Sequence, residues 1–399
     1  MPDAASLAVW AGGERAGLLA RESPGEYVFA YRPDTGPGAQ VSLTMPVRLK
    51  TWASRELHPI FQMNLPEGAL LETIRRAIAK VVGEDDLSIL RVTGGNQVGR
   101  NRFSLPGDES PHIEETPESL EELLTYPDTR ELFNELVARH ALRSGISGVQ
   151  PKVLLDAADR GALSSSGYIV KSWGTDYPFL AANEYFCMSA ARRAGLPTPD
   201  FFLSDNGGLF VMRRFDITPD GDPIGFEDMC SLQALGTSRK YSSSCERVAK
   251  TIGDFVSGDR LMAAREQFFA TLVLSVMLRN GDAHLKNFGV LYTAPRSTVE
   301  LAPVYDVVTT TVYIAKDVPA LTIAGTKKWW PRKVLERFAV AHLSLSVKKV
   351  SDTFANTAEA VMETRKTVPG YIADHPEFHE IGERMIAQWE EGVKGLVER

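Results

Sequence analysis

The sequence contains few cysteines and lacks paired metal-ligand motifs. Its 399 residues include three cysteines, Cys187, Cys230 and Cys245, which are odd in number and widely spaced. No CxxC pair occurs, so we expect neither a disulfide framework nor a structural zinc site. A reducing compartment fits this cysteine usage.

Long apolar runs and an excess of basic residues are also absent. The longest apolar run, around 268–278, is too short to cross a bilayer, and the N-terminus has no basic segment followed by an apolar one. The formal net charge of -7 argues against a protein that coats nucleic acid, because phosphate binding needs clustered Lys and Arg. The short basic patch KKWWPRK at 327–333 is predicted to be a solvated loop. We therefore expect a cytoplasmic protein with no membrane partner.

Histidine spacing offers weak support for a metal-dependent hydrolase. His284 lies two residues after Asp282, and His375 and His379 are four apart. Pro376 disfavours a regular helical ligand pair, and no further His or Cys cluster completes a site. We discount this class.

The chain reads as an α+β protein in four parts. Alternating apolar runs broken by Gly and Pro (LAVWAG, GEYVFAYR, VSLTMPV, GRNRFSLPG) predict a β-rich, barrel-like N-terminal subdomain, interrupted by a helix over EGALLETIRRAIAKVV. The runs PKVLLDA and GYIVKSW predict a hairpin, FLAANEYFCMSAARRAG a helix, and GLFVMRRFD a strand. The predicted parts are the N-terminal subdomain 1–115, a helical connector 116–142, a sheet-bearing lobe 143–216 and a helical lobe 217–399.

A polar cluster, NGDAHLKNFG at 280–289, follows the nearly all-apolar run REQFFATLVLSVML. Asp282 and Asn287 are five residues apart, the spacing at which protein kinases place the Asp that accepts the substrate proton and the Asn that binds a metal ion. A second metal-binding carboxylate is expected on a later strand, and Asp306 in VELAPVYDVV occupies that place.

The segments upstream supply the other parts of a phosphoryl-transfer site. Gly145 and Gly148 in SGISGVQPK form a glycine-containing turn, without a Walker A or GxGxxG pattern. Lys171 ends a predicted strand, and Glu184, thirteen residues later on a helix, is its expected carboxylate partner. Each feature alone is more often a surface residue, a turn former or a core histidine, but their order along the chain is the order of a two-lobed kinase.

Six segments together resemble the HipA family, the serine/threonine kinase toxins of bacterial type II toxin–antitoxin pairs. They are SGISGVQPKVLL, YIVKSW, LFVMRRFD, FEDMCSLQALG, NGDAHLKNFG and APVYDVV, and FQMNLPEGALLETI and DDLSILRVTGGNQVG look like the family's N-terminal subdomain. The resemblance spans nearly the whole chain. It implies a two-lobed kinase-like fold with a β-rich N-terminal part and an all-helical C-terminal part.

The resemblance assigns roles to particular residues. Asp282 would accept the proton, Lys171 would contact phosphate, and Asn287 and Asp306 would bind Mg²⁺. The residues implied to bind ATP are Ser147, Gly148, Val149, Gln150, Pro151 and Lys152 of the phosphate loop, Lys171, Glu184, Arg213, Arg214 and Phe215 of the hinge at the adenine, His284, Leu285, Lys286, Asn287, Tyr305 and Asp306.

The phosphate loop departs from the family pattern at one position. Several members carry Ser-x-Ser and autophosphorylate the first serine, which silences the kinase. Here Gly145 stands at that position, between Ser144 and Ser147. Autophosphorylation is therefore expected, if at all, at Ser147, with Ser144 left open.

The resemblance also implies partners. They are a HipB-like helix-turn-helix antitoxin dimer, operator DNA bound through that antitoxin, and a protein substrate such as an aminoacyl-tRNA synthetase. Two alternatives stay open: a small-molecule phosphotransferase like the aminoglycoside kinases, which share the Asp-to-Asn spacing, and a non-catalytic protein that binds antitoxin or DNA.

Overall fold

The computed structural model describes residues 6–23, 25–67, 71–72, 74–75, 85–109, 118–140, 144–145, 150, 152–158 and 166–397. The chain divides into two compact units, each built from several segments. Unit 1 comprises residues 1–172, 211–237 and 290–298, and unit 2 comprises residues 173–210, 238–289 and 299–399. The predicted helix over 67–82 lies largely outside the described residues, and the four predicted domain boundaries stay predictions.

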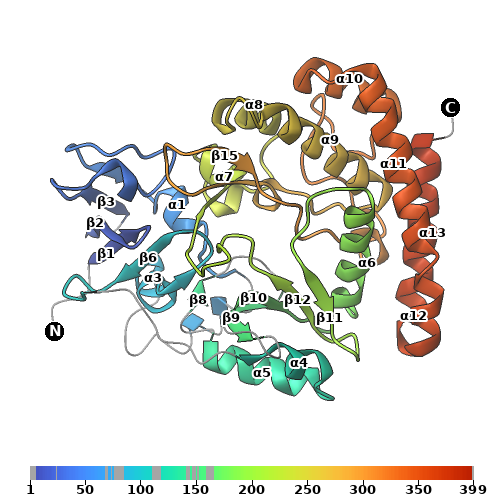
Figure 1. Cartoon of the computed structure of the whole chain (residues 1–399), viewed down its shortest axis with the longest axis horizontal. Helices are drawn as coiled ribbons and strands as arrows, with labels where there is room; N and C mark the ends of the chain where they lie inside the picture. Colours follow the sequence, from blue (N-terminus) through green and yellow to red (C-terminus); the bar gives the residue numbers. More distant parts are fainter. Residues whose placement is uncertain are drawn as a thin grey trace. The chain divides into compact units, whose positions relative to one another are not determined.

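Unit 1 is the strand-rich part of the chain (Figure 1). Its strands and helices are β1 (Ser6–Ala11), β2 (Glu14–Ser23), β3 (Glu26–Tyr31), β4 (Trp52–Ser54), α1 (Pro59–Gln62), α3 (Asp86–Thr93), β5 (Asn96–Gln97), β6 (Asn101–Ser104), β7 (Glu118–Ser119), α4 (Leu120–Thr125), α5 (Thr129–His140), β8 (Ser144–Gly145), β9 (Lys152–Ala158), β10 (Ser166–Lys171), β13 (Gly225–Asp228) and α7 (Met229–Leu232). Strand β12 (Phe210–Arg213) enters unit 1 at residue 211.

The N-terminal sheet has the strand order β4-β3-β2-β1-β6. All its pairings are antiparallel, as short alternating runs joined by tight turns favour. Phe61 of α1 packs on the sheet, with its ring 5.3 Å from that of Phe29 and 5.8 Å from that of Phe103. Gly17 is required in β2, because a Cβ there would lie 2.2 Å from the carbonyl oxygen of Ala30.

The second sheet of unit 1 contains the predicted hairpin. Strands β9 and β10 pair antiparallel, and β12 and β7 flank them. The helical connector is present as α4 and α5, and α5 packs on β9. The run VSLTMPV, predicted as a strand, instead turns back on itself through an isolated bridge between Ser42 and Met45, because the Ser42 hydroxyl and the Leu43 amide bond to the buried carboxyl of Glu227.

Unit 2 is mainly helical. Its elements are α6 (Leu180–Arg193), β11 (Phe201–Leu203), α8 (Cys245–Phe255), α9 (Leu261–Met277), the 3-10 turn η3 (Leu285–Asn287), β15 (Val299–Leu301), the 3-10 turn η4 (Thr310–Val312), α10 (Arg332–Leu343), α11 (Val347–Arg365), α12 (Val368–Asp374), the 3-10 turn η5 (Pro376–Phe378) and α13 (His379–Val397). Strand β14 (Gly289–Tyr292) begins in unit 2 and continues in unit 1. Two short 3-10 turns, η1 (Pro37–Ala39) and η2 (Thr237–Arg239), are also present in the described part of the chain.

Helix α9 is the centre of unit 2. Every residue from Thr271 to Met277 is buried, as a helix without a polar face must be. Helices α8, α10, α11 and α13 pack against it, and α11 runs beside α13 (Figure 1). Along α13, Ile381, Met385, Trp389 and Leu396 are buried, so the helix packs through one apolar face.

The expectation of an α+β protein with a strand-rich N-terminal part and a helical C-terminal part is confirmed. The three cysteines all lie among the described residues, where they are buried and form no disulfide. Within the described ranges, no helix is long and apolar enough to cross a membrane.

Candidate active site

The polar loop after α9 begins with a sharp change of direction. Arg279 adopts a left-handed backbone conformation (φ 56°), which an L-residue with a side chain rarely takes. Its guanidinium is held by an ion pair of 2.9 Å with Glu391 and lies 5.1 Å above the Trp329 ring. The amide of Asn280 still bonds back to the Ser275 carbonyl at 2.8 Å, so the loop starts from a closed helix end.

Gly281 sits where a side chain does not fit. Its amide donates to the Thr310 hydroxyl at 2.8 Å, and that hydroxyl donates to the Arg279 carbonyl at 3.1 Å. A Cβ on Gly281 would lie 2.0 Å from Oδ2 of Asp317. The glycine therefore lets the loop approach the 310–317 segment closely.

Asp282 is fixed by contacts on its main chain and its carboxylate. Its amide donates to Oδ1 of Asn280 at 3.1 Å, and its carbonyl accepts from the amide of His284 at 2.7 Å. The hydroxyl of Tyr241 donates to Asp282 Oδ1 at 2.7 Å. Asp282 is half-buried as a residue, and the hydrogen bond from Tyr241 holds its carboxylate in place.

The structure brings Asn287 and Asp306 together. The side-chain amide of Asn287 donates to Asp306 Oδ2 at 3.0 Å, and its Oδ1 accepts from the amide of His284 at 3.2 Å. Asp306 is left-handed (φ 61°), a strained conformation that is common at functional sites. The Tyr305 hydroxyl donates to the Lys286 carbonyl at 2.7 Å, which ties the segment before Asp306 to the same loop.

The electrostatics of this cluster bear mainly on Asp282. Burial raises the pKa of its carboxyl to about 6; the hydrogen bond from Tyr241 lowers the pKa, and the nearby charge of Asp306 raises it again. The positive charge of Lys240 lowers the pKa of Asp282, and the negative charge of Asp317 raises it. A carboxylate of this pKa is ionised near neutral pH and is still basic enough to accept a proton.

His284 and Leu285 are also residues of this loop that were predicted to line the ATP site. The His284 ring lies 5.1 Å from that of Tyr241 in an edge-on arrangement. Leu285 is fully buried, so its side chain belongs to the core and not to the surface of the loop. Glu184, on α6, is fully buried and is not a surface residue. Its pairing with Lys171 stays a prediction.

In unit 1, the predicted phosphate-binding residues fall on the hairpin. Lys152 of β9 and Lys171 of β10 occupy directly paired positions, so both side chains leave the same face of the sheet. They are 5% and 3% exposed. The side-chain amide of Gln150 donates to the Ser172 carbonyl at 2.9 Å. The predicted residues Ser147, Gly148, Val149 and Pro151 lie outside the described residues.

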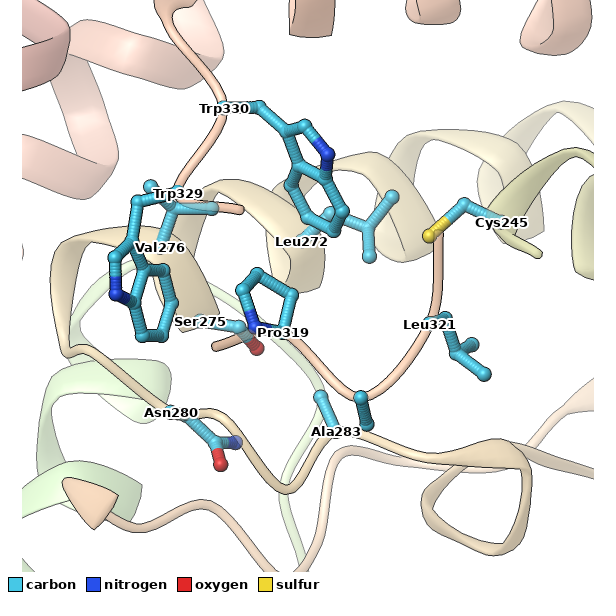
Figure 2. Close-up of a pocket in the computed structure, with 11 residues that line it drawn as sticks. Cys245, Leu272, Ser275, Val276, Asn280, Ala283, Pro319, Leu321, Trp329 and Trp330 are labelled. Carbon is cyan, nitrogen blue, oxygen red and sulfur yellow. The ribbon is translucent and has the colours of Figure 1, made fainter. Parts of the chain in front are cut away.

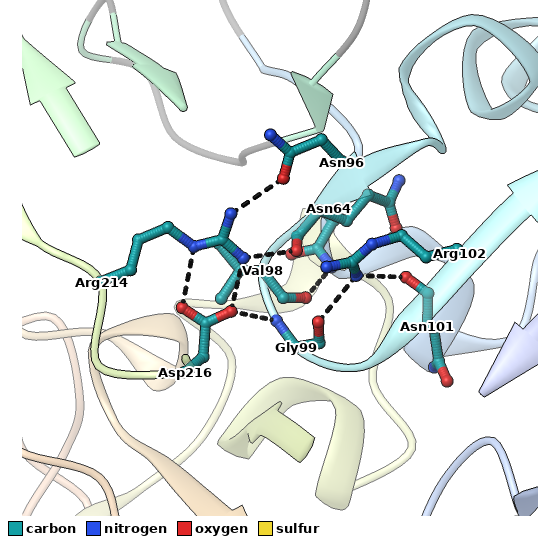
Figure 3. A network of polar contacts seen from close by, with 9 residues as sticks. Asn64, Asn96, Val98, Gly99, Asn101, Arg102, Arg214 and Asp216 are labelled. Carbon is teal, nitrogen blue, oxygen red and sulfur yellow. Dashed lines mark hydrogen bonds and ion pairs between the residues drawn. The ribbon is translucent and has the colours of Figure 1, made fainter. Parts of the chain in front are cut away.

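The predicted hinge, 213–215, meets a polar network inside unit 1 (Figure 3). Arg214 forms a buried ion pair of 2.7 Å with Asp216, whose Oδ2 accepts from the Gly99 amide at 2.7 Å. Arg214 also donates to Oδ1 of Asn96 at 2.8 Å and to the carbonyl of residue 97. Burial, followed by the charge of Arg214, lowers the pKa of Arg102 to about 10. The Arg214 side chain therefore holds the 96–102 segment.

A small cavity of about 10 Å³ lies behind the polar loop, with room for about one water molecule. Figure 2 shows Asn280 and Ala283 of the loop on one side and Trp329 and Trp330 on the other. The two tryptophans belong to the basic patch predicted as a solvated loop. Trp330 is instead buried, and its indole N–H donates to the Thr326 carbonyl at 3.2 Å.

Sequence reasoning missed three residues of the site: Tyr241, Thr310 and Asp317. Thr310 lies 29 positions from Gly281, and Tyr241 lies 41 positions from Asp282, although each pair is joined by a hydrogen bond. No local pattern in the sequence points to such contacts.

Comparison with known proteins shows the family to which the chain is similar. The HipA-like C-terminal domain family matches residues 144–365, and the HipA N-terminal domain family matches residues 7–104. The chain is 28% identical over 405 residues to "Putative kinase Y4dM" of Sinorhizobium fredii, which covers 92% of this chain and 93% of that protein. It is 29% identical over 340 residues to "Putative kinase Y4mE" of the same organism, and the alignment covers 77% of this chain and 78% of that protein.

Among solved structures, the fold is similar to that of a chain in the complex of Shewanella oneidensis HipA and HipB with operator DNA. The TM-score is 0.68 at 18% identity, over 97% of this chain and 95% of that chain. At this identity the likeness concerns the fold alone.

Proposed function

The chain belongs to the HipA family, and on that premise we propose that it is an ATP-dependent serine/threonine protein kinase that acts as the toxin of a type II toxin–antitoxin pair. The observation that supports the proposal most is the cluster of Asp282, Asn287 and Asp306 within one unit. The kinase names of the relatives agree with it.

Asp282 is the proposed general base. The hydroxyl of an acceptor serine or threonine must lose its proton as it attacks the γ-phosphate, and a positioned carboxylate accepts it. A pKa near 6 keeps Asp282 ionised at pH 7 to 8. Protonation below pH 6 would remove the base, so transfer should slow as the pH falls through that value.

Asn287 and Asp306 fit a magnesium ion. The two side chains are already in contact through Nδ2 of Asn287, which donates to Asp306 Oδ2, and each side chain carries a hard oxygen donor of the kind that suits Mg²⁺. Among the described residues, no three His, Cys, Asp or Glu side chains gather around a common point. Two protein ligands suit an ion that completes its coordination with nucleotide phosphates and water, where it would neutralise phosphate charge.

Lys152 and Lys171 are the proposed phosphate contacts. They occupy paired positions on one face of the sheet, where two lysine side chains together suit a polyanion such as the triphosphate of ATP. The backbone of Arg213, Arg214 and Phe215 is proposed to face the adenine. Ser147 is the proposed autophosphorylation position in the phosphate loop.

A substitution at Asp282 tests the activity. Asp282→Asn should lower phosphoryl transfer by about 10²- to 10⁴-fold, because a positioned general base contributes on that order. Transfer would be followed with γ-labelled ATP and a lysate of the native cell, and acid hydrolysis of the labelled protein would identify phosphoserine or phosphothreonine. Binding of ATP with Mg²⁺ should be retained.

The matched control is Asp254→Asn, which removes an exposed carboxylate paired with Lys250 on α8. It should transfer phosphate at the parent rate. Parent-level transfer by the Asp282→Asn variant would contradict the assignment of the base. Label appearing only on small molecules would favour the phosphotransferase alternative.

The proposed partner is a basic helix-turn-helix antitoxin dimer that binds operator DNA and restrains the kinase. The net charge of -7 supports this division of labour, because the chain alone has little capacity for phosphate contacts. The similar Shewanella chain was solved with HipB and operator DNA. The proposed substrate is a translation component such as an aminoacyl-tRNA synthetase.

Affinity purification from the native cell tests the partner. It should recover a helix-turn-helix protein encoded beside this gene, and the purified chain alone should bind the operator weakly. Recovery of the chain alone, together with tight and sequence-specific operator binding, would overturn the partner proposal. Mass spectrometry of synthetases incubated with the kinase and ATP would test the substrate.

A further inference from the structure

Tyr241 contacts the proposed base from a distant part of the chain. It lies in the connection between η2 and α8, and its hydroxyl donates to Asp282 Oδ1 at 2.7 Å. The bond engages one carboxylate oxygen. Oδ2 has no hydrogen-bond donor among the residues that the structure describes, so it is the oxygen left to receive a proton.

The main chain around Tyr241 is tied to the loop that bears the base. The carbonyl of Lys240 accepts from the amide of Leu285 at 3.2 Å. The carbonyl of Tyr241 accepts from Nζ of Lys327 at 3.1 Å. The tyrosine is thus anchored at the peptide on either side of its Cα, and its position follows that of the polar loop.

The tyrosine ring is also constrained. It packs edge-on against the His284 ring at 5.1 Å between centroids. Because His284 lies two residues after Asp282 on the same loop, the ring and the hydroxyl contact the loop at two points. Rotation of the tyrosine side chain would break both contacts, although the residue is 41% exposed.

Main-chain hydrogen bonds to Thr322 hold the segment after Tyr241. The amide of Cys245 donates to the Thr322 carbonyl at 2.9 Å, and the amide of Thr322 donates to the Ser243 carbonyl at 3.4 Å. The hydroxyl of Ser244 accepts from the amide of Arg247 and caps α8. These hydrogen bonds therefore hold the 240–245 segment, and Tyr241 within it, in a defined position.

We propose that Tyr241 is a positioning residue for phosphoryl transfer: its hydroxyl holds Oδ1 of Asp282, which orients Oδ2 toward the acceptor hydroxyl. This inference rests on the proposed kinase function. The reacting proton passes to Asp282, and Tyr241 keeps its own proton throughout. A carboxylate free to rotate would present the accepting oxygen for only part of the time, which lowers the rate of the chemical step without weakening nucleotide binding.

Tyr241→Phe isolates the hydroxyl. It should lower kcat by about 10- to 100-fold, the loss of a hydrogen bond to a charged group, with the KM for ATP unchanged within about twofold. The matched control is Tyr177→Phe, which removes the hydroxyl of a tyrosine that is 40% exposed in the same unit. It should leave kcat and KM at parent values. A fall in kcat accompanied by an equal loss of affinity for ATP with Mg²⁺ would overturn the positioning role.

A double-mutant cycle separates the inference from the function on which it rests. In the Asp282→Asn background, Tyr241→Phe should change kcat by less than about twofold, because the carboxylate that it orients is gone. The same loss in both backgrounds would show that the tyrosine acts independently of Asp282 and would overturn the inference. Parent activity of Asp282→Asn would instead remove the proposed function, whereas loss in Asp282→Asn with parent kcat in Tyr241→Phe would overturn the inference alone.

Discussion

Replacing Glu227 by glutamine should remove a pH dependence from the stability of unit 1. Glu227, on β13, is fully buried. Its Oε1 accepts from the Leu43 amide at 2.6 Å and from the Tyr292 hydroxyl at 2.7 Å, and its Oε2 accepts from the Ser42 hydroxyl at 2.7 Å. A single carboxyl thus joins three segments that are distant in the sequence.

The magnitude follows from the pKa of this carboxyl. Burial raises the pKa of Glu227 from 4.5 to about 7, although the three hydrogen bonds lower it, and the charge of Asp228 raises it further. Between pH 4.5 and 7 the folded protein therefore binds more protons at this site than the unfolded chain does. The free energy of unfolding should decrease as the pH rises through that window, by about 3 kcal/mol in total, since each pKa unit is worth about 1.4 kcal/mol.

Glutamine has nearly the same shape as glutamate, and its side chain does not ionise. Its oxygen can accept from Leu43 and Tyr292, and its amide can donate to Ser42, whose hydroxyl also contacts Thr44 at 2.8 Å. Relative to the parent, Glu227→Gln should gain about 3 kcal/mol of stability between pH 4.5 and 8. Urea unfolding at several pH values, followed by tryptophan fluorescence, would measure the difference.

The control is Glu14→Gln, which changes a solvent-exposed carboxylate of the same unit. Its unfolding curve should follow the parent at every pH. A difference between the Glu227→Gln variant and the parent that stays constant from pH 5 to 8 would refute the reasoning, since it would mean that the buried carboxyl titrates alike in the folded and unfolded states.

Three further predictions concern the network of unit 1, the loop and the nucleotide. Asp216→Ala should destabilise the protein by about 3 to 5 kcal/mol in urea unfolding, because it leaves the buried charge of Arg214 without its partner; a loss below about 1 kcal/mol would be inconsistent with this. Gly281→Ala should lower kcat, since its Cβ would displace Asp317, whereas Gly253→Ala on α8 should leave kcat unchanged; equal rates for both would contradict the close approach. ATP should raise the melting temperature more with Mg²⁺ than with EDTA, and equal shifts would count against the oxygen pair as a magnesium site.

Local sequence determined the parts of the site that lie within one segment. The nearly all-apolar run 265–278 favours a buried helix, and the polar residues that follow it therefore lie at the end of that helix. The five-residue spacing of Asp282 and Asn287 therefore placed both in one short loop before any tertiary contact was known. The sequence also predicted the hairpin of β9 and β10, because two β-rich runs joined by a polar connection tend to pair with each other.

Patterns of apolar residues did not determine which runs extend into strands. VSLTMPV alternates like a strand, but it turns at 42–45, and its Ser42 side chain bonds to Glu227 instead of lying on a sheet. Glu184 is one charged residue on a helix with apolar neighbours, and nothing in that pattern shows that it is fully buried. Burial is a property of what packs on each residue, which lies elsewhere in the chain.

Tertiary structure alone decided what surrounds the proposed base. Tyr241 is 41 positions before Asp282, and the carboxylate contact between them depends on how the 240–245 segment is held against the loop and Thr322. Spacing in a sequence fixes relations within a helix or a turn, where the backbone geometry repeats. Contacts between segments depend on packing that no repeat encodes, which is why the base could be found from its spacing and the hydroxyl that orients it could not.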